Sequence, residues 1–370
     1  MCPVAPQRLS PVLDVAQVHR LTLYSGCMGP QCRGLPLRVV APPLLFLTAL
    51  LAAGCTQWAD ASAPQTTVFP ASDINRQILD LYALIFWMAV VVFVGVEGFL
   101  LYTIVRFRRR ADNQMPTQTH GNTRLEVAWT ILPSIVLLVI AIPTIPTIFA
   151  QDTVPPNATQ RVRVVGHQWW WEFQYPDLGV VTANELHLPI GQTARFDLTS
   201  ADVIHSFWVP RMGGKMDVVP TRTNLLWFTP EQTGEFLGQC VEFCGIQHAN
   251  MRLRLIVDTP EGFEAWVQQQ RATAAQPSGD AQRGAQLFQQ GACVGCHTIR
   301  GTNAAGTVGP DLTHFGSRRT VAAGMLDSNP QNLNRWIQDP QGVKTGAKMP
   351  NLGLSDADAE ALAAYLLSLR

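Results

Sequence analysis

Two long apolar stretches constrain the fold of this 370-residue chain more than any other feature. Residues 81–105 carry a single charged side chain, Glu97, and residues 127–148 carry none, although prolines interrupt the second stretch. A helix needs about 20 apolar residues to cross the hydrocarbon core of a bilayer, and membrane helices tolerate proline where neighbouring groups satisfy the freed carbonyls. We therefore predict a two-helix transmembrane hairpin within residues 75–150. The alternative, two buried helices of a soluble core, fits this length and composition poorly.

Basic side chains between the two stretches indicate the orientation of the hairpin. Short loops rich in arginine and lysine stay on the cytoplasmic side of a membrane. The intervening segment carries Arg106, Arg108, Arg109, Arg110 and Arg124. We therefore expect a cytoplasmic loop, and we expect the chain from about residue 151 onward to lie on the outer face.

The N-terminal region has the order of parts that is typical of a bacterial secretory signal. Arg38 precedes a short apolar run at 39–51, and small residues then lead to Cys55. The run is too short to span a bilayer comfortably. We predict that residues 1–55 are an extension and a signal peptide of the lipoprotein type, with Cys55 lipidated and the mature N-terminus outside. A plain signal peptide is the alternative, and Met28 is a candidate for the true start.

The outer part of the chain divides into regions of different pattern. Short alternating apolar and polar runs, separated by turn residues, predict a β-sandwich or barrel of about 100 residues, which we place at 155–270. Residues 271–280 have the composition of a linker. Residues 281–370 look helical, with a capping-box pattern before the last helix. The expected fold is therefore a multidomain membrane protein with a transmembrane hairpin, an all-β domain and an all-α domain.

Composition excludes one class of function and makes the cysteines informative. The formal net charge is zero, which argues against a nucleic-acid partner. The eight cysteines could form disulfides, but the last four occur as C-x3-C and C-x2-C pairs, each followed by a histidine. Close cysteine pairs with a nearby histidine are typical of metal or cofactor sites.

The first cysteine cluster favours copper. Its thiolate, imidazole and thioether groups come from Cys240, Cys244, His248 and Met251. These are soft or borderline ligands, whereas zinc would gain little from the methionine. A single blue-copper site uses one cysteine, so two bridging thiolates suggest two coppers, each needing one further nitrogen. His205, at the start of an apolar stretch, is the candidate for the second histidine.

Several longer motifs accompany this cluster. They are HSFWVP at 205–210, KMDVVPTR at 215–222, GQCVEFCGIQHANM at 238–251, LEVAWTILPSI at 125–135 and GHQWWWEFQYP at 166–176. Over roughly residues 75–258 the chain resembles subunit II of the haem–copper cytochrome c oxidases. The resemblance implies a cupredoxin-like β domain that holds a binuclear CuA centre.

The resemblance also implies a ligand set for the two coppers. One nitrogen for each copper would come from a histidine, two thiolates would bridge the pair, and a thioether would be a weak ligand. The corresponding residues are His205 and His248, Cys240 and Cys244, and Met251.

Further positions follow from the same resemblance. Glu242 would give its backbone carbonyl to copper, and its side chain corresponds to a magnesium ligand at the interface with subunit I. Trp169 corresponds to the residue that takes up electrons for CuA. Glu126 corresponds to the mouth of a proton pathway, although a carboxylate near a helix N-terminus is also simply favourable against the helix dipole. Thr221 departs from the family, which usually has glycine there.

The second cysteine cluster is a haem c attachment motif. Cys293, Cys296 and His297 form C-x-x-C-H, in which each thiol adds to a haem vinyl group and the histidine reaches the iron. The sequences GPDLT at 309–313 and KMP at 348–350 resemble those of mono-haem cytochromes c. This resemblance implies Met349 as the sixth ligand, with Met325 as the rival. Zinc would need a fourth ligand, and the region has no further cysteine.

The two sites together predict an electron relay. The resemblance implies a subunit of an aerobic cytochrome c oxidase in the bacterial inner membrane, in which electrons pass from covalent haem c to CuA and on to the haem of subunit I. There O2 would be reduced to water with proton pumping. The implied partners are subunits I and III and an upstream donor such as a soluble cytochrome or the bc complex. A short flexible linker would hold the donor domain at around millimolar local concentration.

Three other classes of protein share part of this pattern. A quinol oxidase subunit II has the spans and the barrel but lacks the copper ligands. A nitrous-oxide reductase carries CuA but needs a large catalytic domain. A copper-delivery or redox-sensing membrane protein would explain a cysteine pair, but it would not explain His205, Met251 and the haem motif together.

Overall fold

The computed structural model describes residues 64–108 and 117–370. The predicted signal peptide at 1–55, with Cys55, lies outside these residues, as does part of the arginine-rich loop. The described residues form two long helices, a two-sheet β domain and a helical domain, which confirms the predicted fold class.

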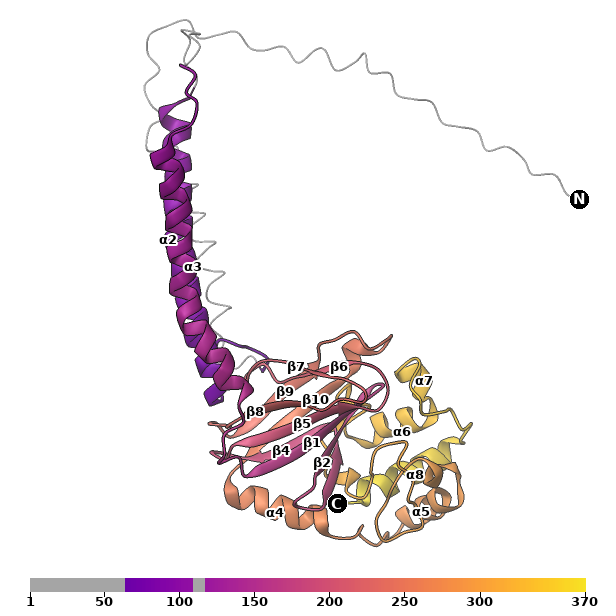
Figure 1. Cartoon of the computed structure of the whole chain (residues 1–370). Helices are drawn as coiled ribbons and strands as arrows, with labels where there is room; N and C mark the ends of the chain where they lie inside the picture. Colours follow the sequence, from indigo (N-terminus) through magenta and orange to yellow (C-terminus); the bar gives the residue numbers. More distant parts are fainter. Residues whose placement is uncertain (1–63, 109–116) are drawn as a thin grey trace, which may run out of the picture. The chain divides into compact units, whose positions relative to one another are not determined.

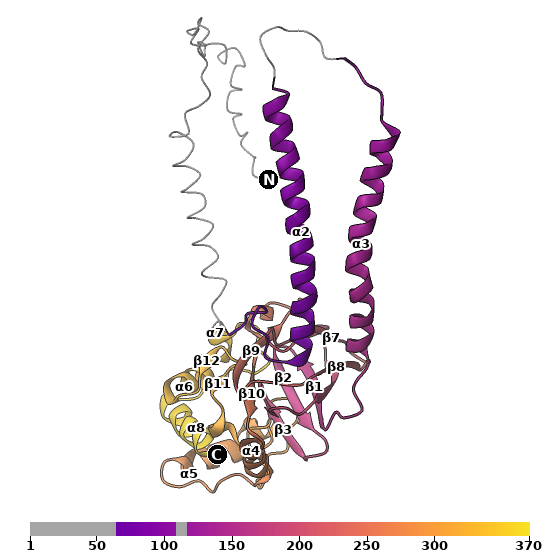
Figure 2. The same ribbon diagram turned by 90° about the vertical axis from the view of Figure 1, so that its left-hand side faces the viewer.

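The two apolar stretches form the helices α2 (Asp73–Arg106) and α3 (Thr123–Asp152), which Figure 2 shows along their length. Each begins at a side-chain cap, because Ser72 and Asn122 accept hydrogen bonds from backbone N–H groups of the first turn. Both are long and apolar enough to cross a membrane, and their apolar windows are unburied within the described chain. Their side chains are therefore available to lipid or to another subunit.

The outer ends of both helices extend past the predicted spans and are anchored on the β domain. Asp73 Oδ1 accepts a hydrogen bond from Thr229 N at 2.8 Å, close to the start of α2. Near the end of α3, Trp227 Nε1 donates to Gln151 O at 2.9 Å. The β domain is thus held directly on the hairpin.

The β domain is a sandwich of two five-stranded sheets, drawn in magenta to orange in Figure 1. The strand orders are β3-β2-β1-β5-β8 and β4-β10-β9-β6-β7, and the pairs β1–β5 and β4–β10 are parallel. The strands are β1 (Gln160–His167), β2 (Trp170–Tyr175), β3 (Val180–Ala183), β4 (Glu185–Pro189), β5 (Ala194–Ser200), β6 (His205–Trp208), β7 (Met216–Val218), β8 (Asn224–Phe228), β9 (Gly234–Cys240) and β10 (Arg252–Asp258).

Alternation along the strands places one set of side chains in the core between the sheets. In β2 the buried residues Trp171, Phe173 and Tyr175 alternate with half-buried ones, and Phe196 and Phe207 pack against them from β5 and β6. Large aromatic groups therefore fill a stiff core directly below β6 and β9, the strands that carry the first cysteine cluster.

The C-terminal region forms a separate helical core, drawn in orange to yellow in Figure 1. It follows α4 (Pro260–Arg271) of the β domain. Its elements are α5 (Ala281–Gln290), η3 (Ala292–Gly295), η4 (Phe315–Ser317), β11 (Thr320–Val321), β12 (Leu326–Asp327), α6 (Pro330–Gln338), α7 (Pro340–Val343) and α8 (Asp356–Ser368). The predicted capping box is present, since Ser355 accepts from Asp358 N at the start of α8.

The helices α5 and α8 cross closely because of a glycine. A Cβ atom at Gly284 would collide with the backbone of Ala361, so no larger residue fits at this point of the crossing. Next to it, Phe288 and Tyr365 meet edge to face with ring centroids 5.9 Å apart. This crossing supports the short η3 segment, in which the C-x-x-C-H motif begins.

Candidate copper and haem centres

Five of the predicted copper ligands converge at one edge of the β domain. The two thiols lie at the centre, with Cys240 Sγ 3.7 Å from Cys244 Sγ. On one side, Nδ1 of His205 lies 3.9 Å from Cys240 Sγ. On the other side, Nδ1 of His248 lies 3.6 Å and Sδ of Met251 3.9 Å from Cys244 Sγ.

The ends of two neighbouring strands and one loop position these groups. His205 begins β6 and Cys240 ends β9, and the β9–β10 loop supplies the other three. Backbone hydrogen bonds close the loop, from Cys240 N to Met251 O at 2.9 Å and from Val241 N to Ser206 O at 3.1 Å. The carbonyl of Glu242 lies 3.3 Å from Cys240 Sγ, whereas its side chain is exposed.

The donor set fits a pair of coppers. Both thiols are free and buried, and their separation is too long for a disulfide, which needs about 2 Å between sulfurs. Contact with the Cys244 thiol lowers the pKa of Cys240 to about 3, despite burial, and the same contact raises the pKa of Cys244. A buried pair of cysteine sulfurs, with one imidazole beside each sulfur, is a site for soft cations.

Asp202 orients the first histidine. Its Oδ1 lies 2.9 Å from His205 Nε2, which leaves Nδ1 directed toward Cys240. Burial lowers the pKa of His205, but the hydrogen bonds to Asp202 and Cys240 outweigh it and the net shift is upward. Asp202 was not among the residues predicted from the sequence, although an acidic residue three positions before a candidate ligand is a usable signal.

A glycine in β1 makes room for the same histidine. A Cβ atom at Gly166 would lie 2.7 Å from Cδ2 and 3.1 Å from Cγ of His205. His205 is completely buried, so its ring is enclosed by the β1 backbone on one side and by the thiol on the other.

The three tryptophans of the 169–171 segment have different roles. Trp171 is fully buried in the sandwich core, and Trp170 stacks on His167 with ring centroids 4.1 Å apart, so both are packing residues. Trp169 is 9 % exposed, and its Nε1 donates to the carbonyl of Cys244 at 3.0 Å. The Trp169 indole is therefore hydrogen-bonded directly to the β9–β10 loop, which we call the copper-ligand loop.

The C-x-x-C-H motif adopts a geometry suited to haem c. His297 Nδ1 lies 2.8 Å from the carbonyl of Pro310, to which it can donate, so Nε2 is left for the iron. Burial lowers the pKa of His297, which favours the neutral imidazole that binds metals. Cys293 and Cys296 are free and half-buried, so both thiols are available for covalent attachment.

Both candidate sixth ligands, Met349 and Met325, are half-buried. Gln341 Nε2 donates to the carbonyl of Met349 at 3.0 Å, which ties that methionine to α7. The remaining histidine of the domain, His314, is buried, and its Nε2 lies 3.1 Å from the carbonyl of Ala272. It therefore connects the domain to the segment that follows α4.

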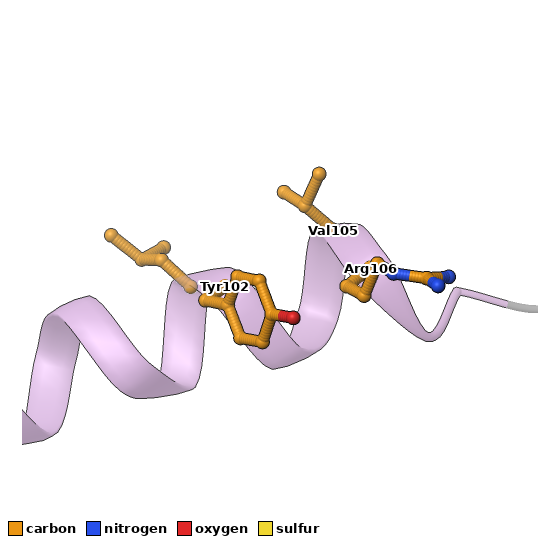
Figure 3. Close-up of a pocket in the computed structure, with 4 residues that line it drawn as sticks. Tyr102, Val105 and Arg106 are labelled. Carbon is orange, nitrogen blue, oxygen red and sulfur yellow. The ribbon is translucent and has the colours of Figure 1, made fainter.

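The candidate proton-pathway residue lies in the first turn of α3. Glu126 is exposed, and its Oε1 accepts a hydrogen bond from Asn122 N at 3.3 Å, which is a capping interaction. At the corresponding end of α2, Tyr102, Val105 and Arg106 line an open depression formed by this helix alone (Figure 3). No metal-ligand cluster lies there among the described residues.

A copper-type site on a β-sandwich, a haem-attachment motif and two apolar helices define a membrane-anchored electron-transfer protein. Family comparisons cover the same three parts. Residues 63–147 match the transmembrane domain of cytochrome c oxidase subunit II, residues 178–258 match its periplasmic domain, and residues 281–370 match cytochrome c.

Whole-chain relatives agree with these matches. The chain is 38 % identical over 338 residues to cytochrome c oxidase subunit 2 of Alkalihalophilus pseudofirmus, covering 89 % of this chain and 96 % of the relative. It is 34 % identical over 349 residues to the Bacillus subtilis protein of the same description, covering 88 % and 96 %. A solved periplasmic domain of subunit II from Bradyrhizobium japonicum is 34 % identical and covers 32 % of this chain and 97 % of that one, with a TM-score of 0.31.

The chain belongs to the cytochrome c oxidase subunit II family and carries a fused C-terminal cytochrome c domain. It is a membrane protein with two transmembrane helices and a periplasmic CuA domain, and it transfers electrons as a subunit of the oxidase. The predicted family, enzyme class, copper and haem c are thereby confirmed.

Proposed function

We propose that this chain takes up electrons at its cytochrome c domain and delivers them through its CuA domain to subunit I of the oxidase. One observation carries the proposal: the converging ligands around Cys240 and Cys244 lie in the same chain as a C-x-x-C-H motif, with hydrogen bonds joining the two domains. Reduction of O2 and proton pumping would take place in subunit I, because this chain supplies only the route to it.

The geometry supports one ligand assignment for the copper site. The side chains of His205, Cys240, Cys244, His248 and Met251, with the carbonyl of Glu242, would hold two coppers. Such a pair accepts and releases one electron. The chain's contribution is rigidity, since ligands held by strand ends and a hydrogen-bonded loop stay in place when the charge of the site changes.

The haem would be held by Cys293 and Cys296 covalently and by His297 and Met349 at the iron. A His/Met pair gives a relatively high reduction potential. The carbonyl of Pro310 fixes the orientation of the His297 ring, and this hydrogen bond would leave Nε2 free to bind the iron.

Trp169 is the proposed connection between the domains. Its indole N–H is bonded to Cys244 O, and a Cβ atom placed at Gly346 of the cytochrome domain would lie 3.5 Å from its Cη2. We therefore assign electron uptake at Trp169 to the fused domain rather than to a freely diffusing cytochrome. The physiological donor, a soluble cytochrome or the bc complex, would then reduce the fused domain.

The remaining assignments depend on neighbours of this chain. The carboxylate of Glu242 is exposed, so it would be free to bind magnesium together with groups from subunit I. Glu126, on the exposed face of α3, would deliver protons to subunit I. With lipidated Cys55 and the N-terminus outside, the hairpin would cross the inner membrane beside subunits I and III.

Metal content and electron paramagnetic resonance of the full chain in detergent test the proposal. We expect two coppers and one haem iron per chain, with an unpaired electron shared equally by two copper nuclei. His248→Asn should abolish the two-nucleus signal. His167→Asn is the matched control, because this histidine stacks on Trp170 in the same domain but is outside the ligand cluster. One copper with a single-nucleus spectrum, or zinc in its place, would contradict the assignment.

A further inference from the structure

The segment before the proposed haem ligand Met349 lies on the rim of the copper site. We call residues 344–349 the methionine loop. Gln247, next to His248, donates from Nε2 to Thr345 O of this loop at 2.8 Å. The loop contacts the β domain, called the copper domain from here on. The residues contacted are Trp169, Asp202, Ile246, Gln247 and Asn250. Each of these lies within a few residues of a proposed copper ligand or bonds to one.

Two of these contacts, a close approach at Gly346 and an ion pair of Lys348, depend on the particular residues in the loop. A Cβ atom at Gly346 would lie 2.6 Å from Cδ1 of Ile246, so a larger residue here would displace the end of that side chain. Gly346 also has a φ of +82°, a conformation that glycine adopts without strain. Nearby, Lys348 Nζ lies 2.9 Å from Asp202 Oδ2, and the same carboxylate orients His205.

At the start of the methionine loop, Lys344 is buried between the two domains. It is 3 % exposed, and its Nζ donates to Trp169 O at 2.8 Å, to Asn250 O at 2.8 Å and to Ala322 O at 3.1 Å. An ammonium group has three N–H donors, and all three are used. Two of the carbonyls belong to the copper domain and the third to the cytochrome domain.

The environment of this ammonium is unusual for a structural lysine. No ion pair of the described residues includes Lys344. Burial lowers its pKa to about 7, with a further lowering by the nearby Arg252 and a partial compensation by Cys244. A buried cation without a counter-ion is costly and persists only where specific hydrogen bonds offset the lost hydration. Here those bonds join three backbone segments.

We propose that Lys344 is a positioning residue, which fixes the methionine loop on the copper-site rim so that the haem and the copper pair of one chain face each other in a single docked arrangement. This inference rests on the proposed function. The three carbonyls are well placed for this role: Trp169 bonds to the copper-ligand loop, Asn250 precedes Met251, and Ala322 lies in the β11–β12 turn.

The β11–β12 turn provides a second, independent contact beside the lysine. Arg252 N donates to Ala323 O at 3.2 Å, and a Cβ atom at Gly324 would lie 2.9 Å from Cβ of Arg252. The turn contains two non-glycine residues with positive φ, Ala322 at 55° and Ala323 at 61°. Such backbone is retained only where the surroundings enforce it, and here it presents the Ala322 carbonyl to the lysine.

The test uses the full chain in detergent, loaded with copper and haem, and the variant Lys344→Met. Methionine keeps a long unbranched side chain but removes the charge and all three donors. Lys215→Met is the matched control, because Lys215 is exposed on the copper domain. An electron is placed on the haem by a photoexcited ruthenium dye, and the rate at which it leaves for copper is followed by absorbance.

We expect the docking equilibrium constant of Lys344→Met to fall by roughly ten- to a hundredfold, the factor associated with losing hydrogen bonds to a charged group. Electron transfer within the chain should slow and become dependent on solvent viscosity, because the domains must then meet by diffusion. The haem and copper spectra, the metal content and both midpoint potentials should stay as in the parent protein.

A second readout does not use the loaded protein. In the copper-free chain, amide hydrogen exchange should rise in the methionine loop and in the β11–β12 turn of Lys344→Met, but not in the crossing of α5 and α8. A lysine that only stabilises the interior of the cytochrome domain would raise exchange at that crossing as well. If Lys344→Met does not fold, Lys344→Arg is measured instead, because the larger planar group cannot satisfy the same three carbonyls.

The outcomes separate this inference from the proposed function. If the parent chain transfers no electron from haem to copper, the proposed function is wrong. If the parent does so and Lys344→Met matches it in rate and in hydrogen exchange, only the positioning role is overturned. A slowed rate with raised exchange confined to the interface supports the role.

Discussion

Replacing Gly166 by alanine should disturb the copper site although no proposed ligand residue is changed. The new Cβ atom would lie 2.7 Å from Cδ2 of His205, whereas carbon atoms in favourable contact are about 3.5–4.0 Å apart. The ring must therefore move by roughly 1 Å, which exceeds the tolerance of about 0.5 Å within which a functional site works.

The ring has little freedom to make this movement. His205 is completely buried, and its Nε2 is held by Asp202 Oδ1 at 2.9 Å. The alanine methyl cannot easily move away either, because it would lie 3.4 Å from Cγ1 of Val218. Overpacking of this kind costs about 1–3 kcal/mol. If that cost falls on the copper-binding arrangement of His205, the affinity for copper should drop by about 5- to 150-fold.

Competition with a chelator gives the copper affinity, and electron paramagnetic resonance gives the sharing of the electron between nuclei. Gly214→Ala is the control, because a Cβ atom at Gly214 meets nothing within 4 Å. We expect weaker copper binding and unequal sharing in Gly166→Ala only. Parent-like affinity and spectra in Gly166→Ala would refute the idea that this close approach positions His205.

Three further predictions concern other parts of the chain. Thr221 has a φ of +62°, a region costly for a β-branched residue, so Thr221→Gly should raise the free energy of unfolding by about 0.5–1 kcal/mol, measured by denaturant titration of tryptophan fluorescence. Burial raises the pKa of Asp202, but hydrogen bonds from His205 and Lys348 among others hold it well below its ordinary value. Its stabilising effect should therefore be complete above the ordinary pKa of about 4 and decline gradually below it, so the stabilities of the copper-free parent and Asp202→Asn should converge only as the pH falls through the lowered pKa of Asp202. Met349→Leu should lower the haem midpoint potential and remove the spectrum of a methionine-ligated haem, whereas Met325→Leu should leave both unchanged; the reverse result would reassign the sixth ligand.

Local chemistry made much of the site predictable from the sequence. Ligand spacing in the C-x3-C and C-x2-C clusters is a property of single loops. The search for a second imidazole led to His205, whose Nδ1 lies 3.9 Å from Cys240 Sγ in the structure. The family departure at Thr221 coincides with a positive φ, which explains why glycine is usual there.

Contacts between distant segments were not predictable in this way. Lys344 and Trp169 are 175 residues apart in the sequence, and Asp202 and Lys348 are 146 apart. No periodicity or motif spacing connects such pairs. A lysine in an otherwise polar stretch is normally assigned to the surface, and only the packed structure shows that its ammonium is enclosed by three carbonyls.

These long-range contacts change the expected character of the tether. The composition of residues 271–280 indicated a flexible linker and a donor held at high local concentration. In the structure, Ala274 N donates to Arg300 O at 3.2 Å within that segment, and the methionine loop bonds to the copper domain on the other side of the interface. Electron transfer between domains that are already docked does not require the two domains to meet by diffusion. Its rate would therefore be set by the geometry of the interface. Trp169 is only 9 % exposed, so under the proposed function electrons would reach it from within the chain, and a diffusing donor would meet the cytochrome domain first.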